Sequence, residues 1–157
     1  MKVTLLVTGK TDSGWLQQGF DVYAKRLQHY VSFEIKVLPD LKNTRHLDAA
    51  EFREREARQL LPHILGKPEV YLLDETGDQL TSRQLAGFIE KRQLASAKEL
   101  FFIIGGAYGF SSEVYSAASG KISLSRMTFS HQMARLLFAE QLYRAFTLIR
   151  GEKYHND

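Results

Sequence analysis

The sequence predicts a single α/β domain with a mainly parallel sheet and helices on both faces. Segments of strand character and segments of helical periodicity alternate along the chain, which is typical of this fold class. Residues 100–104 are apolar without alternation, as in a parallel strand covered on both sides. The chain has 157 residues, of which 44% are hydrophobic, and it contains no repeat or linker. One domain over residues 1–157 is therefore expected.

The first half of the chain predicts three strands and two helices. Residues 3–8 are apolar and β-branched and end at Gly9, which indicates a buried strand. Apolar residues then recur every three or four positions from Trp15 to Tyr30, the period of an amphipathic helix. The following segments are predicted as a strand (33–38), a polar and basic loop (41–46), a helix (47–61) and a strand (69–74). The charges of the second helix alternate in sign, Arg53 and Glu56 among them, which is typical of a solvated face; an RNA-facing role for part of this segment is the alternative.

The second half begins with a predicted turn at residues 75–78 and a helix over residues 82–91 that Ser82 can cap. After the strand at residues 100–104, Ser111 or Ser112 caps a short helix. Residues 122–125 form the last strand. The last helix covers residues 131–150, and Thr128 or Ser130 can cap it.

The last helix is apolar over more of its circumference than one face of a sheet requires. A helix of this kind needs cover on a second side, and little of the chain remains after it to provide that cover. A second copy of the protein can supply it. The sequence therefore predicts a symmetric homodimer.

Composition excludes several classes of protein. The chain has no cysteine, which rules out disulfides, thiolate metal sites and a cysteine nucleophile, and no metal site is expected. The net charge of +3 is too small to indicate a nucleic-acid binder by itself. No apolar run approaches the roughly 20 residues of a membrane span, and the N-terminal run is too short for a signal peptide. A soluble cytoplasmic protein is the expectation.

Two loops near the end of the chain predict a small-molecule site. One begins at Gly105 and continues to Gly109; the other covers residues 124–129. Both leave the carboxyl ends of predicted strands, where ligands of open α/β sheets bind. Glycines allow backbone amides to approach a ligand, although an ordinary strand-to-helix turn would also use them. His131 can act as a base or as a phosphate contact, or it can be a plain residue at the start of a helix.

The motifs of the last third, taken together, resemble the ribosomal RNA large subunit methyltransferase H family. The matching segments are Gly105-Gly106 with Gly109, residues 123–135, residues 140–146 and residues 150–155, and the resemblance extends over the whole length. It implies a SPOUT fold with a C-terminal trefoil knot, an exception to the rule that chains are unknotted. It further implies a homodimer that uses S-adenosylmethionine to methylate N3 of a pseudouridine in 23S ribosomal RNA, on the assembled ribosome.

The resemblance also assigns roles to residues. Leu73, Gly105 and the run Leu124, Ser125, Arg126, Met127, Thr128 and Phe129 are implied as cofactor contacts, and Arg144, Tyr154 and His155 are implied to face the target nucleotide. The imide proton must leave before or during attack, so His155 or His131 is expected to accept it and Arg144 to stabilise the anionic base. A mobile tail from one subunit is expected to close over the cofactor of the other. The alternatives are a SPOUT enzyme acting on transfer RNA and a non-catalytic ribosome-binding module.

Overall fold

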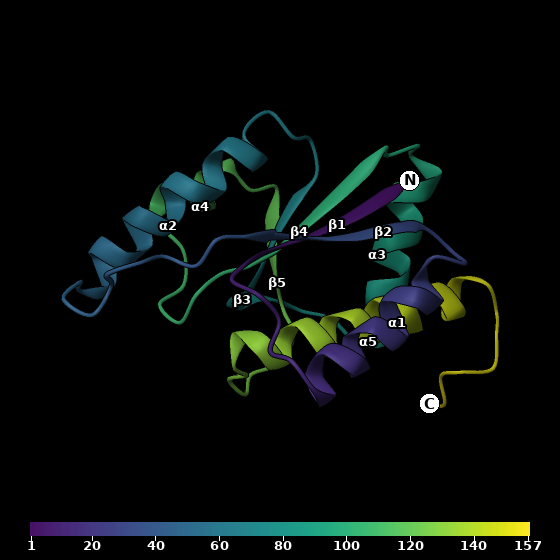
Figure 1. The fold of residues 1–157 in the computed structure, drawn as a ribbon. Helices are drawn as coiled ribbons and strands as arrows, with labels where there is room; N and C mark the ends of the chain where they lie inside the picture. Colours follow the sequence, from purple (N-terminus) through teal and green to yellow (C-terminus); the bar gives the residue numbers. More distant parts are fainter.

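The structure is a computed structural model that describes residues 1–157, and strands and helices alternate strictly along it (Figure 1). The prediction of an α/β fold is confirmed. The elements are β1 (Lys2–Thr8), α1 (Trp15–Leu27), β2 (Ser32–Leu38), α2 (Ala49–Ile64), β3 (Val70–Gln79), α3 (Ser82–Leu94), β4 (Glu99–Ile104), α4 (Ser112–Ala117), β5 (Gly120–Ser123) and α5 (His131–Ile149).

The five strands form one sheet in the order β2-β1-β4-β3-β5, and every neighbouring pair is parallel. Helices α2 and α4 cover one face, and α1, α3 and α5 cover the other (Figure 1). Because successive side chains of a strand point to opposite faces, each central strand contributes to two cores. In β4, for example, Phe102 packs in the core with α5 and Phe101 packs in the core with α2.

The structure contradicts the turn predicted at residues 75–78. These residues belong to the second half of β3, which resumes pairing with β5 after a shift of register between Leu73 and Asp78. The glycine and acidic residues resemble a turn locally. Contact with β5, which lies more than forty residues later in the chain, keeps them extended.

Two of the predicted caps are confirmed and one is wrong. Ser111 caps α4 and Ser130 caps α5. The Ser111 hydroxyl accepts a hydrogen bond from the Val114 amide, and the Ser130 hydroxyl accepts one from the Met133 amide. Helix α3 is capped by Thr81 instead of Ser82: the Thr81 hydroxyl accepts from the Gln84 amide at 3.1 Å, and the Gln84 side chain accepts from the Thr81 amide at 2.8 Å. This reciprocal pair is a capping box. Ser82 instead donates to the Gln141 side chain on α5.

Helix α5 lies between α1 and α3 over the sheet, and His131 is its one exposed residue. The second side of α5 is thus covered largely by the same chain, because α1 and α3 flank it. The apolar circumference of α5 therefore does not by itself require a second copy, and the homodimer stays a prediction. No helix of the structure has both the length and the apolar character that crossing a bilayer requires.

Candidate functional site

A pocket of about 830 Å³ opens at the carboxyl ends of β3, β4 and β5. Leu73 of β3, Ile104 of β4 and Leu124 just after β5 line it, together with the glycine loop 105–110 and the start of α5. The two loops that the sequence singles out do meet here. Their strands β4 and β5 are not neighbours, however, because β3 lies between them and adds a third wall. The predicted location of the site at this edge of the sheet matches the position of the pocket.

The glycine loop is held from behind by a buried carboxylate. Glu56 of α2 is 1% exposed, and the Gly106 amide donates to its two oxygens at 3.0 and 3.2 Å. A Cβ on Gly106 would lie 2.8 Å from the Phe52 ring, and a Cβ on Gly105 would lie 2.7 Å from the Phe110 ring. The two glycines are thus required by packing behind the loop. The Gly106 amide is committed to Glu56 and does not face a ligand.

The position of Glu56 contradicts its predicted place on a solvated face. Burial raises the pKa of its carboxyl, and the hydrogen bond from Gly106 opposes that shift. The sequence contains a signal for this burial, because Phe52, Glu56, Leu60 and Ile64 recur every four residues and share one face of α2. A carboxylate on that apolar stripe is the feature that indicates a buried role.

The start of α5 is fixed by a second buried charge. Arg135 is 1% exposed, and its guanidinium donates at 2.8 Å to the carbonyl oxygens of both Thr8 and Gly9 and at 3.1 Å to the Thr11 hydroxyl. These contacts tie α5 to the carboxyl end of β1. His131, one turn earlier, is exposed and lines the pocket. Glu56 and Arg135 are the two charged residues that the fold buries. Each forms hydrogen bonds with backbone groups at this edge of the sheet, Glu56 with an amide and Arg135 with carbonyls.

An ionised carboxylate also lines the pocket. Asp74 follows Leu73 and accepts hydrogen bonds from the Tyr115 hydroxyl and, at 2.8 and 2.6 Å, from the amide and hydroxyl of Thr76. Partial burial acts to raise the pKa of Asp74, but the hydrogen bonds from Thr76 and Tyr115 and the charge of Lys121 outweigh burial and lower it. Sequence analysis missed Asp74 and Tyr115. An acidic residue at the end of a predicted strand is the signal that points to Asp74.

Most of the residues implied as cofactor contacts lie in this pocket, and one does not. Leu73, Gly105, Leu124, Ser125, Met127, Thr128 and Phe129 all line it. Arg126 is exposed and is not among the lining residues. No three side chains of the types that bind metals are grouped anywhere in the structure.

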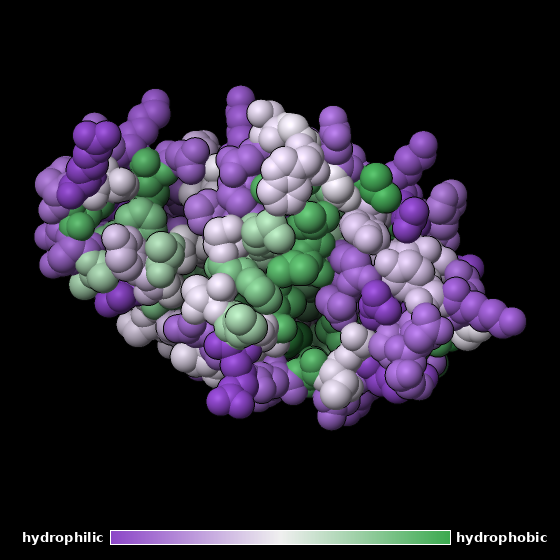
Figure 2. All heavy atoms as spheres, turned by 90° about the horizontal axis from the view of Figure 1, so that it is seen from below, coloured by the Kyte–Doolittle hydropathy of each residue, from purple (hydrophilic) through white to green (hydrophobic).

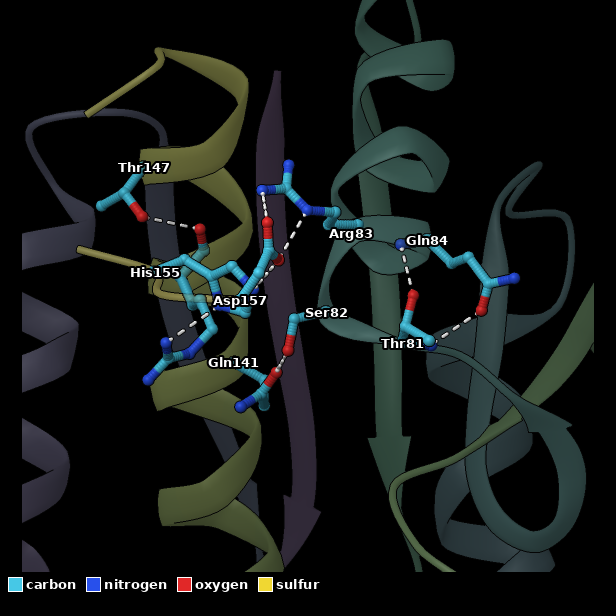
Figure 3. A network of polar contacts seen from close by, with 9 residues as sticks. Thr81, Ser82, Arg83, Gln84, Gln141, Thr147, His155 and Asp157 are labelled. Atoms are coloured by element: carbon cyan, nitrogen blue, oxygen red, sulfur yellow. Dashed lines mark hydrogen bonds and ion pairs between the residues drawn. The ribbon is translucent and has the colours of Figure 1, made fainter. Parts of the chain in front are cut away.

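The other candidate residues form a separate cluster near the C-terminus, which we call the tail cluster: Glu140, Arg144, Tyr154, His155 and Asp157. Figure 3 shows His155 and Asp157 of this cluster beside Arg83 of α3. Glu140 accepts from Arg144 at 2.5 Å and from the Tyr154 hydroxyl at 3.0 Å. Asp157 pairs with Arg83 of α3. Since His131 and Arg144 are thirteen residues apart on α5, the cluster lies roughly 20 Å along the helix from the pocket of the same chain.

The tail cluster engages both ring nitrogens of His155. Its Nδ1 lies 3.2 Å from the Arg144 guanidinium, and its Nε2 lies 3.0 Å from the Asp157 carboxylate. Arg144 can only donate, so Nδ1 accepts and Nε2 carries the hydrogen that Asp157 accepts. These contacts hold the tail against α5 and α3. The mobility of the tail stays a prediction.

Comparison with known proteins gives close matches over the full length. The family model described as "Predicted SPOUT methyltransferase" matches residues 1–155. The ribosomal RNA large subunit methyltransferase H of Parabacteroides distasonis is 47% identical over 157 residues, which cover 100% of both chains. The protein of the same name from Christiangramia forsetii is 48% identical over 156 residues, 99% of each chain. Among solved structures, TrmJ from Z. mobilis ZM4 aligns with 100% of this chain and 72% of its own, at 15% identity and a TM-score of 0.49.

Proposed function

The chain belongs to the SPOUT methyltransferase family, and on that premise we propose that it uses S-adenosylmethionine to methylate N3 of a pseudouridine in 23S ribosomal RNA, on the assembled ribosome. The observation that carries this proposal is the pocket at the ends of β3, β4 and β5, which gathers seven of the eight residues implied as cofactor contacts. Relatives named for the large ribosomal subunit favour this substrate over transfer RNA. Action on the ribosome also implies a cytoplasmic protein.

The residues of the pocket fit a cofactor with a flat aromatic base and a positive charge. Leu73, Leu124 and Phe129 offer apolar contact, and loop backbone lies beside them. Asp74, whose lowered pKa keeps it ionised at neutral pH, places a negative charge on the wall. S-adenosylmethionine supplies an activated methyl group on a sulfonium. The pocket can hold that methyl in line with a nucleophile, which is the main requirement of such a displacement.

The chemical groups that act on the nucleotide are proposed to come from the tail cluster. Arg144 stabilises the negative charge that develops on the base, because a guanidinium keeps its charge at all relevant pH values. His155 accepts the imide proton once its Nδ1 is released from Arg144, and Tyr154 packs beside the base. His131, at the pocket wall, is the second candidate for proton acceptor. No metal takes part in this scheme.

A homodimer would bring the tail cluster of one subunit to the cofactor pocket of the other. The tail cluster lies too far along α5 to reach the pocket of its own chain, so the pocket of a second copy is its proposed partner. Trp15 and Val22 of α1 are exposed, as are Met127 and Phe129 before α5. Figure 2 shows hydrophobic residues gathered in a hollow on the side of the molecule where α1 and α5 lie in Figure 1. Apolar surface of this kind is typical of an interface between subunits.

Mass spectrometry of ribosomal and transfer RNA from a strain that lacks the protein tests the substrate. Loss of one methyl group on a 23S pseudouridine is expected, and loss on transfer RNA instead would contradict the proposal. Calorimetry with S-adenosylmethionine tests the cofactor, because a non-catalytic module gives no saturable heat. Deletion of residues 154–157 is expected to abolish methylation and to leave cofactor affinity within about threefold, since the tail is proposed to act on the nucleotide and the cofactor contacts come from residues 73–129.

A further inference from the structure

The carboxylate of Glu56 is the one buried acid of the chain, and nothing in the proposed reaction uses it. No cationic side chain lies within ion-pair distance of it. A buried charge without an opposite charge is costly, so a site that keeps one needs hydrogen bonds to it. The hydrogen bonds here come from a single backbone group, the Gly106 amide. The buried carboxylate therefore bonds to a single peptide group, that of Gly106 in the glycine loop.

That peptide lies at the wall of the pocket. Gly105 and Gly106 line the pocket on their outer side and contact Glu56 on their inner side, where a Cβ on either would be 3.0 to 3.1 Å from a Glu56 oxygen. Helix α2 makes a second contact with the same loop, because Arg53 donates to the Tyr108 carbonyl at 3.3 Å. Arg53 is partly exposed and its bond is long, so Glu56 makes the stronger of the two hydrogen-bonded attachments. Phe52 of α2 also packs edge-on against the Tyr108 ring.

We propose that Glu56 is a positioning residue for cofactor binding: its carboxylate fixes the Gly106 peptide and so holds residues 105–110 in the shape that lines the pocket. Glu56 does not contact the pocket and acts only through the loop. The expected effect of Glu56 on cofactor binding rests on the proposed function. Its effect on the shape of residues 105–110 is independent of that function.

The test compares Glu56→Gln, which keeps an oxygen at the same reach, with Glu56→Leu, which keeps the size and loses the acceptor. Isothermal calorimetry gives the affinity for S-adenosylmethionine, and hydrogen exchange measured by NMR reports on the Gly106 amide. Glu56→Leu is expected to weaken cofactor binding about tenfold or more and to speed exchange at Gly106 by a similar factor. Glu56→Gln is expected to stay within about threefold on both measurements. At saturating cofactor, Glu56→Leu should keep kcat within about threefold while KM for the cofactor rises.

Leu60→Ala is the matched control, because Leu60 is fully buried one turn further along α2 and does not line the pocket. It destabilises the same helix through a cavity. Equal loss of cofactor affinity in Leu60→Ala and Glu56→Leu would overturn the proposal, as would wild-type affinity in Glu56→Leu or an equal loss in Glu56→Gln.

Two further readouts separate this inference from the proposed function and from failure of a variant to fold. In the unmodified protein, the Gly106 amide should exchange slowly although it lies in a loop, and exchange at the rate of an open loop would overturn the role of Glu56 without any variant. If the unmodified protein gives no saturable heat with S-adenosylmethionine, the proposed function fails, while exchange at Gly106 still decides whether Glu56 holds the loop.

Discussion

Gly77 of β3 lies directly against the backbone of Ile122 in β5. A Cβ on Gly77 would be 2.6 Å from the Ile122 nitrogen and 2.6 Å from the Lys121 carbonyl carbon, closer than any side chain permits. The contact therefore requires glycine at this position. It lets the second half of β3 pair with β5 and so sets the position of the loop 124–129, which leaves β5 and lines the pocket.

Gly77→Ala is expected to destabilise the fold by about 2 kcal/mol and to weaken binding of S-adenosylmethionine at least tenfold, since the backbone of β5 must shift. Denaturant unfolding and calorimetry measure the two effects. Gly87→Ala is the control, because Gly87 is exposed in α3 with nothing within 4 Å of the added methyl. That change should stabilise the protein by about 0.5 kcal/mol. Wild-type cofactor affinity in Gly77→Ala would show that β5 does not set the pocket.

Asp74→Asn is expected to reduce affinity for S-adenosylmethionine about tenfold and affinity for S-adenosylhomocysteine much less. The two ligands differ in the positive charge of the sulfonium, whereas the loss of one of the two oxygens that accept from Tyr115 and Thr76 affects both ligands alike. Calorimetry with both ligands gives the ratio directly. An equal loss for both would mean that Asp74 acts through hydrogen bonds alone.

The stability of the protein is expected to depend on pH through Glu56. Burial raises the pKa of this carboxyl above its ordinary value of 4.5, so the folded chain holds the proton more tightly than the unfolded chain. The folded state then loses stability as pH rises from about 4.5 through the raised pKa, by about 1.4 kcal/mol for each unit of difference. Glu56→Gln does not titrate. The free energy of unfolding of Glu56→Gln relative to wild type should therefore increase over this range, and a constant difference would contradict the assignment.

Arg135→Met is expected to destabilise the protein by about 3 kcal/mol, because it removes the guanidinium that donates to the buried Gly9 carbonyl and to the partly buried Thr8 carbonyl. Lysine keeps the charge but presents a single donor atom, so Arg135→Lys should cost somewhat less. Urea unfolding measures both variants. Arg45→Met provides the comparison: Arg45 is exposed, and its substitution should change stability by less than about 0.5 kcal/mol. A loss in Arg135→Met no larger than this would show that the carbonyls find other donors.

Local patterns in the amino-acid sequence were enough to predict the class of the fold and the edge of the sheet where the pocket lies. The apolar runs of β1 and β4 are local patterns that indicate burial on both faces of the strand, and the helical period of α1 indicates which side of that helix is buried. The glycine loop and the loop after β5 could be assigned to one site because parallel strands end at the same edge of a sheet.

The roles of single residues depend on contacts between segments that are distant in the chain. Residues 75–78 look like a turn and become a strand because β5 pairs with them, and Glu56 looks solvated and becomes buried because the glycine loop packs on it. The contacts of the tail with Arg83 and Arg144 likewise have no signal in the sequence. In each case the deciding partner is distant in the chain. Periodicity records the burial of a whole face, whereas the environment of one polar side chain depends on which remote backbone or charge lies against it.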